Sequence, residues 1–280
     1  MVLKKQNIIK FIQSIIFLFL LIAISFPFVW IIITSFKRAI DIMSPQFLFT
    51  PTLSNYIDLF FSRSSHFPQY LLNSTIVATS TTVIIISIAG LAAYGISRSE
   101  FMWNIDKMVL GWVLFLRMIF PVALALPFYK IARMLNLYNT KTILIVFYTV
   151  INIPFAVWML KGFFDELPRS YEEAAFIDGC STFGVFWRIA MPIIGSGVAA
   201  TAIFVFMLSW NEYLFALIMT DTPVSMTLPV GMAGLTQQYM VEWGKMAAAA
   251  SVFTVPIFIF STFVQDYLAR GLTMGMGIKG

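Results

Sequence analysis

Charged side chains are scarce in this sequence. Of 280 residues only 11% are charged and 60% are hydrophobic, whereas a soluble domain carries about 25% charged residues. Polar residues must cover the outside of a globular protein, so this composition excludes an ordinary water-soluble fold. The net charge of +5 is spread along the chain without a dense run of Lys and Arg. Because neutralising phosphates needs clustered positive charge, we expect no nucleic-acid partner.

Cysteine and histidine are almost absent. The single cysteine, Cys180, excludes an intrachain disulfide and a cysteine-based metal cage. The single histidine, His66, excludes a pair of histidine ligands and lacks neighbours of the kind that a catalytic triad needs. We therefore expect no catalytic residue, no metal site and no bound cofactor in this chain.

Long apolar stretches are what the sequence has instead. A helix needs about 20 apolar residues to cross the hydrocarbon core of a bilayer, and alternating strand patterns are missing. The sequence predicts an all-α polytopic membrane protein of one domain, 1–280. Its six predicted transmembrane helices are 11–36, 70–97, 108–130, 142–161, 193–219 and 246–267. The first exceeds the roughly 7–15 apolar residues of a cleavable signal sequence, so we expect it to be retained.

The orientation follows from the Lys and Arg residues of the loops. Lys4, Lys5 and Lys10 precede the first span, and the loops on the same side hold more Lys and Arg than those on the other. Because positive loops stay on the cytoplasmic side, both termini are predicted to be cytoplasmic.

The loop between the fourth and fifth spans carries the signals of a short helix. Ser170 and Glu173 have the spacing of a capping box, Glu172 and Glu173 would lie at the positive end of the helix dipole, and Gly179 can end the helix in the left-handed conformation. These signals predict a helix over 171–178. Two turns are unstable alone in water, so another surface must pack against them.

The residues around this helix resemble a known motif. The run EEAAFIDGCSTFGVFWRIAMPI (172–193) resembles the EAA motif of the inner-membrane permeases of binding-protein-dependent ABC importers. Three further stretches resemble the carbohydrate, MalG-like branch of that family: RMIFPVALALPFYKIARMLNLYNT (117–140), LSWNEYLFAL (208–217) and QDYLARGLTMGMGIKG (265–280). The chain departs from the pattern at Cys180, where Ala is usual, and at Met191, where Leu is usual.

The resemblance implies a transport subunit, not an enzyme, in the cytoplasmic (inner) membrane of a bacterium or archaeon. The chain would form half of a pore for a sugar or oligosaccharide, with a second permease subunit, two ATPase subunits and an external solute-binding protein as partners. The short helix would dock on an ATPase subunit through Glu172, Glu173, Ala174, Ala175, Asp178 and Gly179. ATP and magnesium would bind that ATPase, and the chain indeed has no GxxxxGK[ST] phosphate loop.

Polar side chains inside the predicted spans have two interpretations. Arg117 and Glu212 are costly in a bilayer and must face protein or water. They could line the solute path with Trp210, which would stack on a sugar ring, and Asn211, which would bind hydroxyls. Alternatively, they could pair with each other or brace the two permeases against one another, and this structural interpretation is the stronger one.

Other functions remain open from the sequence. The solute could be glycerol phosphate or another small polar molecule. An ion-coupled secondary transporter would need ionisable pairs in the membrane and repeated halves, for which Arg117 and Glu212 are thin support. An intramembrane enzyme lacks a catalytic constellation within the spans.

Overall fold

The computed structural model describes residues 2–43, 49–99, 111, 115, 121–236 and 242–276, and its long elements are helices. The chain divides into two compact units, one of Met1–Pro68 and Met232–Val255 and the other of Gln69–Gly231 and Pro256–Gly280. Helix α4 (Phe67–Arg98) begins at the first boundary, and α14 (Trp243–Met276) continues across the last one.

The first unit is built on one very apolar helix, α1 (Val2–Ser35). Two short helices follow it, α2 (Ala39–Met43) and α3 (Ser54–Phe61). Asn55 on α3 donates hydrogen bonds of 2.8 Å to the backbone carbonyls of Ser35 and Lys37, where α1 ends. Large apolar side chains along α1 are exposed, including Phe17 and Phe19. Exposing such an apolar surface to water would be unfavourable, whereas the hydrocarbon core of a lipid bilayer covers it.

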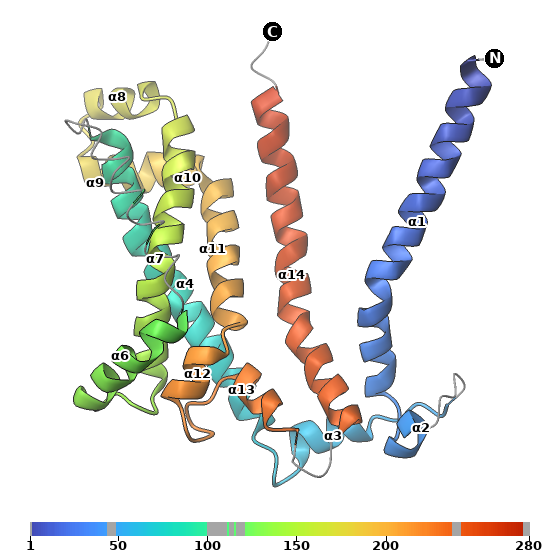
Figure 1. The fold of residues 1–280 in the computed structure, drawn as a ribbon. Helices are drawn as coiled ribbons and strands as arrows, with labels where there is room; N and C mark the ends of the chain where they lie inside the picture. Colours follow the sequence, from blue (N-terminus) through green and yellow to red (C-terminus); the bar gives the residue numbers. More distant parts are fainter. Residues whose placement is uncertain are drawn as a thin grey trace. The chain divides into compact units, whose positions relative to one another are not determined.

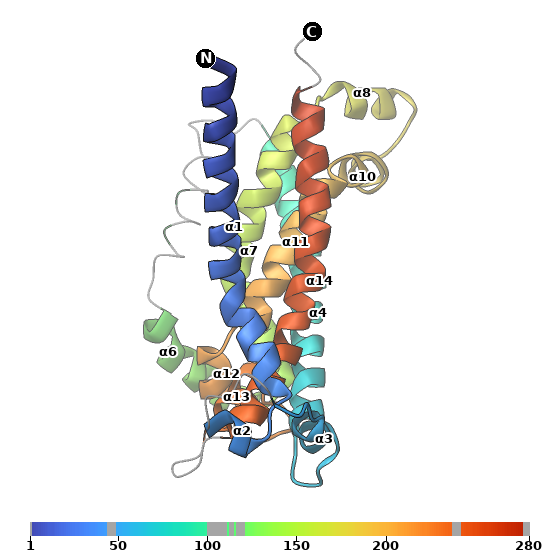
Figure 2. The same ribbon diagram turned by 90° about the vertical axis from the view of Figure 1, so that its right-hand side faces the viewer.

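The second unit packs its helices around α7 (Lys141–Glu166). Figures 1 and 2 show α7 beside α11 (Gly195–Trp210), and the two helices are in contact. The approach is close at Gly197, where an added Cβ atom would overlap the ring of Phe163 on α7. Only glycine fits such a contact without displacing the ring.

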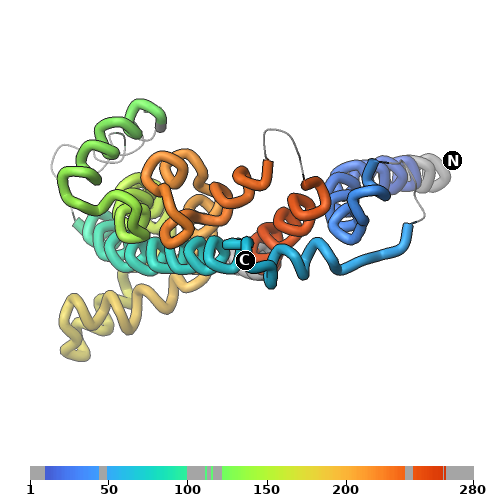
Figure 3. Tube along the Cα trace, turned by 90° about the horizontal axis from the view of Figure 1, so that it is seen from below, coloured from blue at the N-terminus to red at the C-terminus, as the bar shows by residue number. Residues whose placement is uncertain are grey.

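Two apolar clusters hold the second unit together, one towards each end of α7. The first cluster joins α4 and α7 to the segment after α8 (Ser170–Ile177), and includes Ile85, Phe164 and Phe186. The second joins them to α6 (Pro121–Met134) and α12 (Leu214–Met219), and includes Phe147 and Phe215. A further short helix, α13 (Leu228–Ala233), follows α12. Seen from below in Figure 3, α6 and the segment containing α8 lie on opposite sides of α4.

Several helices are long and apolar enough to cross a membrane. Within the described residues these are Lys10–Ser35, Phe67–Arg98, Lys141–Glu166 and Trp243–Phe260. A fifth span arises if Thr182–Ile193 and Gly195–Trp210, bent by 81°, are counted together. Of the predicted span 108–130, the structure describes 111, 115 and 121–130, and α6 covers this last part. The multi-pass, all-helical architecture is therefore confirmed, while the number of six spans stays a prediction.

The predicted span 193–219 needs a correction, because it is not one continuous helix. Helix α11 ends at Trp210, and α12 begins only at Leu214. The interruption contains Glu212, whose carboxylate binds backbone amides of the following turn. This arrangement stabilises a break inside an apolar stretch that hydropathy alone presents as one span.

Candidate functional site

The short helix α8 begins one residue earlier than the sequence indicates, and without the predicted capping box. Ser170 is the first helical residue and Arg169 occupies the N-cap position. The amides of Glu172 and Glu173 donate to the backbone carbonyl of Arg169 at 3.0 and 2.9 Å. Because Ser170 lies inside the helix, its hydroxyl is not where a capping box requires it, and that prediction is wrong.

The end of α8 confirms the predicted role of Gly179. This residue has φ +82°, a left-handed conformation that glycine adopts without strain. Its amide donates to the carbonyl of Phe176, and the amide of Cys180 donates to the carbonyl of Ala175, both at 3.0 Å. These two bonds form a Schellman motif, which satisfies carbonyls that would otherwise be left unbonded at the end of the helix.

Two of the six predicted docking residues face the protein instead of the solvent. Glu172 and Ala175 are buried, whereas Glu173, Ala174, Asp178 and Gly179 are exposed. The nitrogen Nε of Arg98, the last residue of α4, binds both carboxylate oxygens of Glu172 at 2.9 and 2.8 Å. Glu172 therefore holds α8 to the rest of the chain, and the docking prediction applies to the exposed residues.

Large apolar side chains accompany the exposed acidic ones. Ile177 at the end of α8 is 87% exposed, and Tyr171 and Phe176 are exposed as well. Phe183 and Trp187 continue this surface on the segment that follows α8. Exposed aromatic and aliphatic groups next to Glu173 and Asp178 are typical of a protein-binding surface, because a solvated face would be mostly polar.

An aromatic cluster lies where α4 and α7 meet the segment that follows α8. The ring of Tyr94 on α4 lies 5.3 Å from the ring of Phe164 on α7 and 5.3 Å from that of Phe186. Phe186 begins a π-helical turn, Phe186–Ala190, directly before the apolar segment that leads into α11. The surface of α8 is thus attached to the ends of α4 and α7 by apolar packing and by an ion pair.

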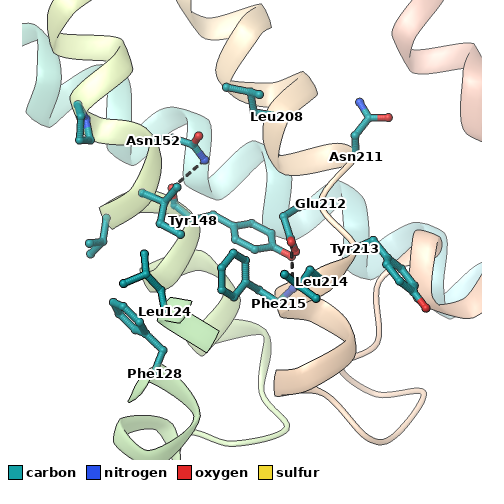
Figure 4. Close-up of a pocket in the computed structure, with 13 residues that line it drawn as sticks. Leu124, Phe128, Tyr148, Asn152, Leu208, Asn211, Glu212, Tyr213, Leu214 and Phe215 are labelled. Carbon is teal, nitrogen blue, oxygen red and sulfur yellow. Dashed lines mark hydrogen bonds between the residues drawn. The ribbon is translucent and has the colours of Figure 1, made fainter. Parts of the chain in front are cut away.

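A second candidate site is a pocket of about 630 Å³ at the break between α11 and α12 (Figure 4). Its lining is mostly apolar, with a few polar groups from α7 and from the break itself. The polar lining residues are Tyr148, Asn152, Asn211, Glu212 and Tyr213. A mainly apolar pocket with few polar groups is the usual form of a small-molecule site.

Glu212 organises the break beside this pocket. One carboxylate oxygen accepts a hydrogen bond from the amide of Phe215 at 2.9 Å. The other accepts from the amide of Ala216 at 3.2 Å and from the hydroxyl of Tyr148 at 2.6 Å. The carboxylate thus satisfies first-turn amides of α12, where negative charge is favoured. This geometry supports the structural interpretation of Glu212.

The other predicted solute-path residues fall in different places. Trp210 is 2% exposed and stacks on Phe206 at 5.5 Å between ring centroids, so its ring is packed inside the protein and cannot stack on a sugar. Asn211 is exposed and lines the pocket, with its amide bonded back to the carbonyl of Met207. Arg117 lies outside the described residues. The predicted set therefore reduces to Asn211 and Glu212 at this pocket.

Sequence reasoning missed Arg98, Asn152 and Asn139. Asn139 adopts φ 60° and its side-chain oxygen accepts from the amides of Asp221 and Thr222 at 2.9 and 3.1 Å, which fixes the turn after α12. The segment LNLYNT shows an Asn before a predicted span, but its partners lie more than 80 residues further along the chain. Arg98 and Glu172 are 74 residues apart, so no local spacing signals that contact.

Comparison with known proteins gives a consistent result. Residues 85–274 match the family described as binding-protein-dependent transport system inner membrane component. The trehalose/maltose transport system permease protein MalG of Thermococcus litoralis is 35% identical over 91% of both chains. The sulfoquinovosyl glycerol transport system permease protein SmoH of Agrobacterium fabrum is 35% identical, covering 91% of this chain and 89% of its own. A bacterial ABC transporter that imports the acidic polysaccharide alginate has the same fold, with TM-score 0.80, 16% identity and coverage of 94% and 97%.

Proposed function

Because the chain belongs to the inner-membrane permeases of binding-protein-dependent ABC importers, in their carbohydrate branch, we propose that it forms half of an ATP-driven pore for a sugar or oligosaccharide. The observation that carries the coupling is α8, which exposes apolar and acidic side chains on a short helix anchored to two spans. Such a surface needs a partner, and an ATPase subunit is the partner that this family implies.

The proposed assembly contains a second permease subunit, two ATPase subunits and an external solute-binding protein. ATP and magnesium bind the ATPase subunits, and both termini and α8 face the cytoplasm. The opposite end of the second unit, with the turn that Asn139 holds, faces the solute-binding protein. Its rigid hydrogen bonding supports this role, since a preordered loop loses less conformational entropy on binding.

The solute class follows from the relatives and from the pocket. The names of two relatives mention trehalose, maltose and sulfoquinovosyl glycerol, all of them sugars or sugar conjugates. In the pocket, Asn152, Asn211 and Tyr213 place amide and hydroxyl groups among apolar ones, which is the combination that binds a sugar's hydroxyls and its apolar ring faces. We assign the solute path of this subunit to that pocket.

Glu173→Lys is expected to abolish uptake in liposomes that contain the complete transporter, trapped ATP and external binding protein. Glu173 is exposed in the first turn of α8, so a lysine there reverses the charge offered to the ATPase and lies at the unfavourable end of the helix dipole. Uptake of radiolabelled sugar and copurification of the ATPase are the measurements.

The matched control is Glu166→Lys, which makes the same charge change at the exposed end of α7. We expect the control to transport normally and the Glu173 variant to lose the ATPase. Normal uptake and normal ATPase binding by Glu173→Lys would rule out docking through α8.

A further inference from the structure

Arg98 is the point at which three helices of the second unit meet. It is the last residue of α4, and its Nε binds the carboxylate of Glu172 in the first turn of α8. Its Nη2 donates to the backbone carbonyl of Leu167 at 3.1 Å, and Leu167 is the C-cap residue of α7. One guanidinium group therefore holds the ends of two spans and the base of α8 together.

The contact between Arg98 and Glu172 is shielded from solvent. The two side chains are 16% and 6% exposed. The single Nε–H of Arg98 is shared between both oxygens of Glu172, and hydrogen bonds between ionised groups are short and charge-assisted. Since neither group can exchange its partner for bulk water at low cost, the pair resists separation when α8 is pulled or pushed.

A separate contact joins the two spans without α8. The hydroxyl of Ser97 on α4 donates to the carboxylate of Asp165 on α7 at 2.6 Å. Asp165 also pairs with Lys161 at 2.6 Å within α7. The ends of α4 and α7 are thus bonded to each other, and a displacement transmitted through Arg98 reaches both.

We propose that the Arg98–Glu172 ion pair transmits the displacement of α8 to α4 and α7, and that Arg98 and Glu172 are positioning residues for coupling, separate from the residues that dock on the ATPase. This inference rests on the proposed function. Neighbouring acidic residues of α8 then have different tasks: Glu173 faces the partner, and Glu172 faces the protein's own spans. This distinction rests on burial, because the side chain of Glu173 is exposed and that of Glu172 is buried.

The test uses the complete transporter with Arg98→Gln, Glu172→Gln and the double variant. We expect each to assemble and hydrolyse ATP, while sugar transported per ATP hydrolysed falls by at least roughly fivefold, the lower end of typical coupling between two sites. The double variant should be no worse than Arg98→Gln alone, because Arg98→Gln already removes the ion pair that Glu172→Gln removes. Arg98→Lys should give a ratio between those of Arg98→Gln and wild type, since one ammonium cannot reach both the Glu172 carboxylate and the Leu167 carbonyl as Nε and Nη2 do.

The matched control is Arg38→Gln, which removes an ion pair with Asp41 in the first unit and none of the contacts around Arg98. It should leave the transport-to-hydrolysis ratio unchanged. An unchanged ratio in both Gln variants would overturn the inference, and so would a wild-type ratio in Arg98→Lys. A loss of assembly in every variant would also overturn it, because the pair would then serve folding alone. If the wild-type transporter itself shows no ATP-driven uptake, the proposed function fails instead.

Discussion

Gly179→Pro is expected to reduce ATP-driven uptake to the level measured without ATP while the spans remain inserted. Proline fixes φ near −65°, whereas Gly179 has φ +82°. Proline also removes the amide that donates to the carbonyl of Phe176 at 3.0 Å. Without its Schellman motif the end of α8 cannot keep its direction, and the exposed residues proposed to dock on the ATPase lose their arrangement.

Replacing Gly179 by Ala as well as by Pro separates the effect of backbone strain at this position from that of steric crowding. Among the described residues, no atom beyond the two chain neighbours of Gly179 lies within 4 Å of a Cβ built there, so Gly179→Ala introduces only the left-handed backbone penalty of about 1–2 kcal/mol. The control is Gly162→Ala on α7, which is equally uncrowded and helical and should be neutral or slightly stabilising. Uptake should decrease from the Gly162 control through Gly179→Ala to Gly179→Pro; wild-type uptake by Gly179→Pro would contradict the role of this turn.

Of the variants proposed for this protein, Glu212→Ala is expected to lower the thermal stability most. The substitution leaves the amides of Phe215 and Ala216 and the hydroxyl of Tyr148 without their acceptor. Each buried polar group that loses its partner costs about 1–3 kcal/mol. We expect a clear fall in the melting temperature of the purified transporter, with uptake lost in parallel.

Asn211→Ala provides the comparison for Glu212. Asn211 lines the same pocket, but it is exposed and its side-chain amide donates to the carbonyl of Met207 in the preceding turn. If the pocket lies on the solute path, this variant should raise the KM for uptake and leave the melting temperature near that of wild type. A Glu212→Ala protein as stable as wild type would show that the carboxylate does not hold the break between α11 and α12.

Most of the architecture follows from the sequence because it depends on local properties. Apolar length determines which stretches can cross a membrane, and the Asp178-Gly179 step determines where α8 ends. The capping box failed for a local reason too: the helix starts at Ser170, so the hydroxyl that matched the motif is one position too late. A motif specifies spacing, whereas the helix start depends on how the chain leaves α7.

The site itself depends on contacts that the sequence does not display. Glu172 looks like a docking residue beside Glu173, and only the position of Arg98, 74 residues earlier, turns it inward. From the sequence, Trp210 could stack on a sugar ring, but in the structure its ring is stacked on Phe206. The sequence predicts that Glu212 faces protein or water, and the structure shows that its partners are the backbone of the next turn and the hydroxyl of Tyr148.

The central claim, that an ATPase drives this chain through α8, is tested most directly by site-specific photo-crosslinking. A photoreactive residue at position 177, where the native side chain is 87% exposed, is compared in the active transporter with one at position 224, which is 67% exposed at the other end of the unit. Position 177 should crosslink to the ATPase subunit, with a yield that changes when ATP is added, and position 224 should not. Crosslinks from position 177 to lipid alone, in a transporter that still takes up sugar, would contradict the claim.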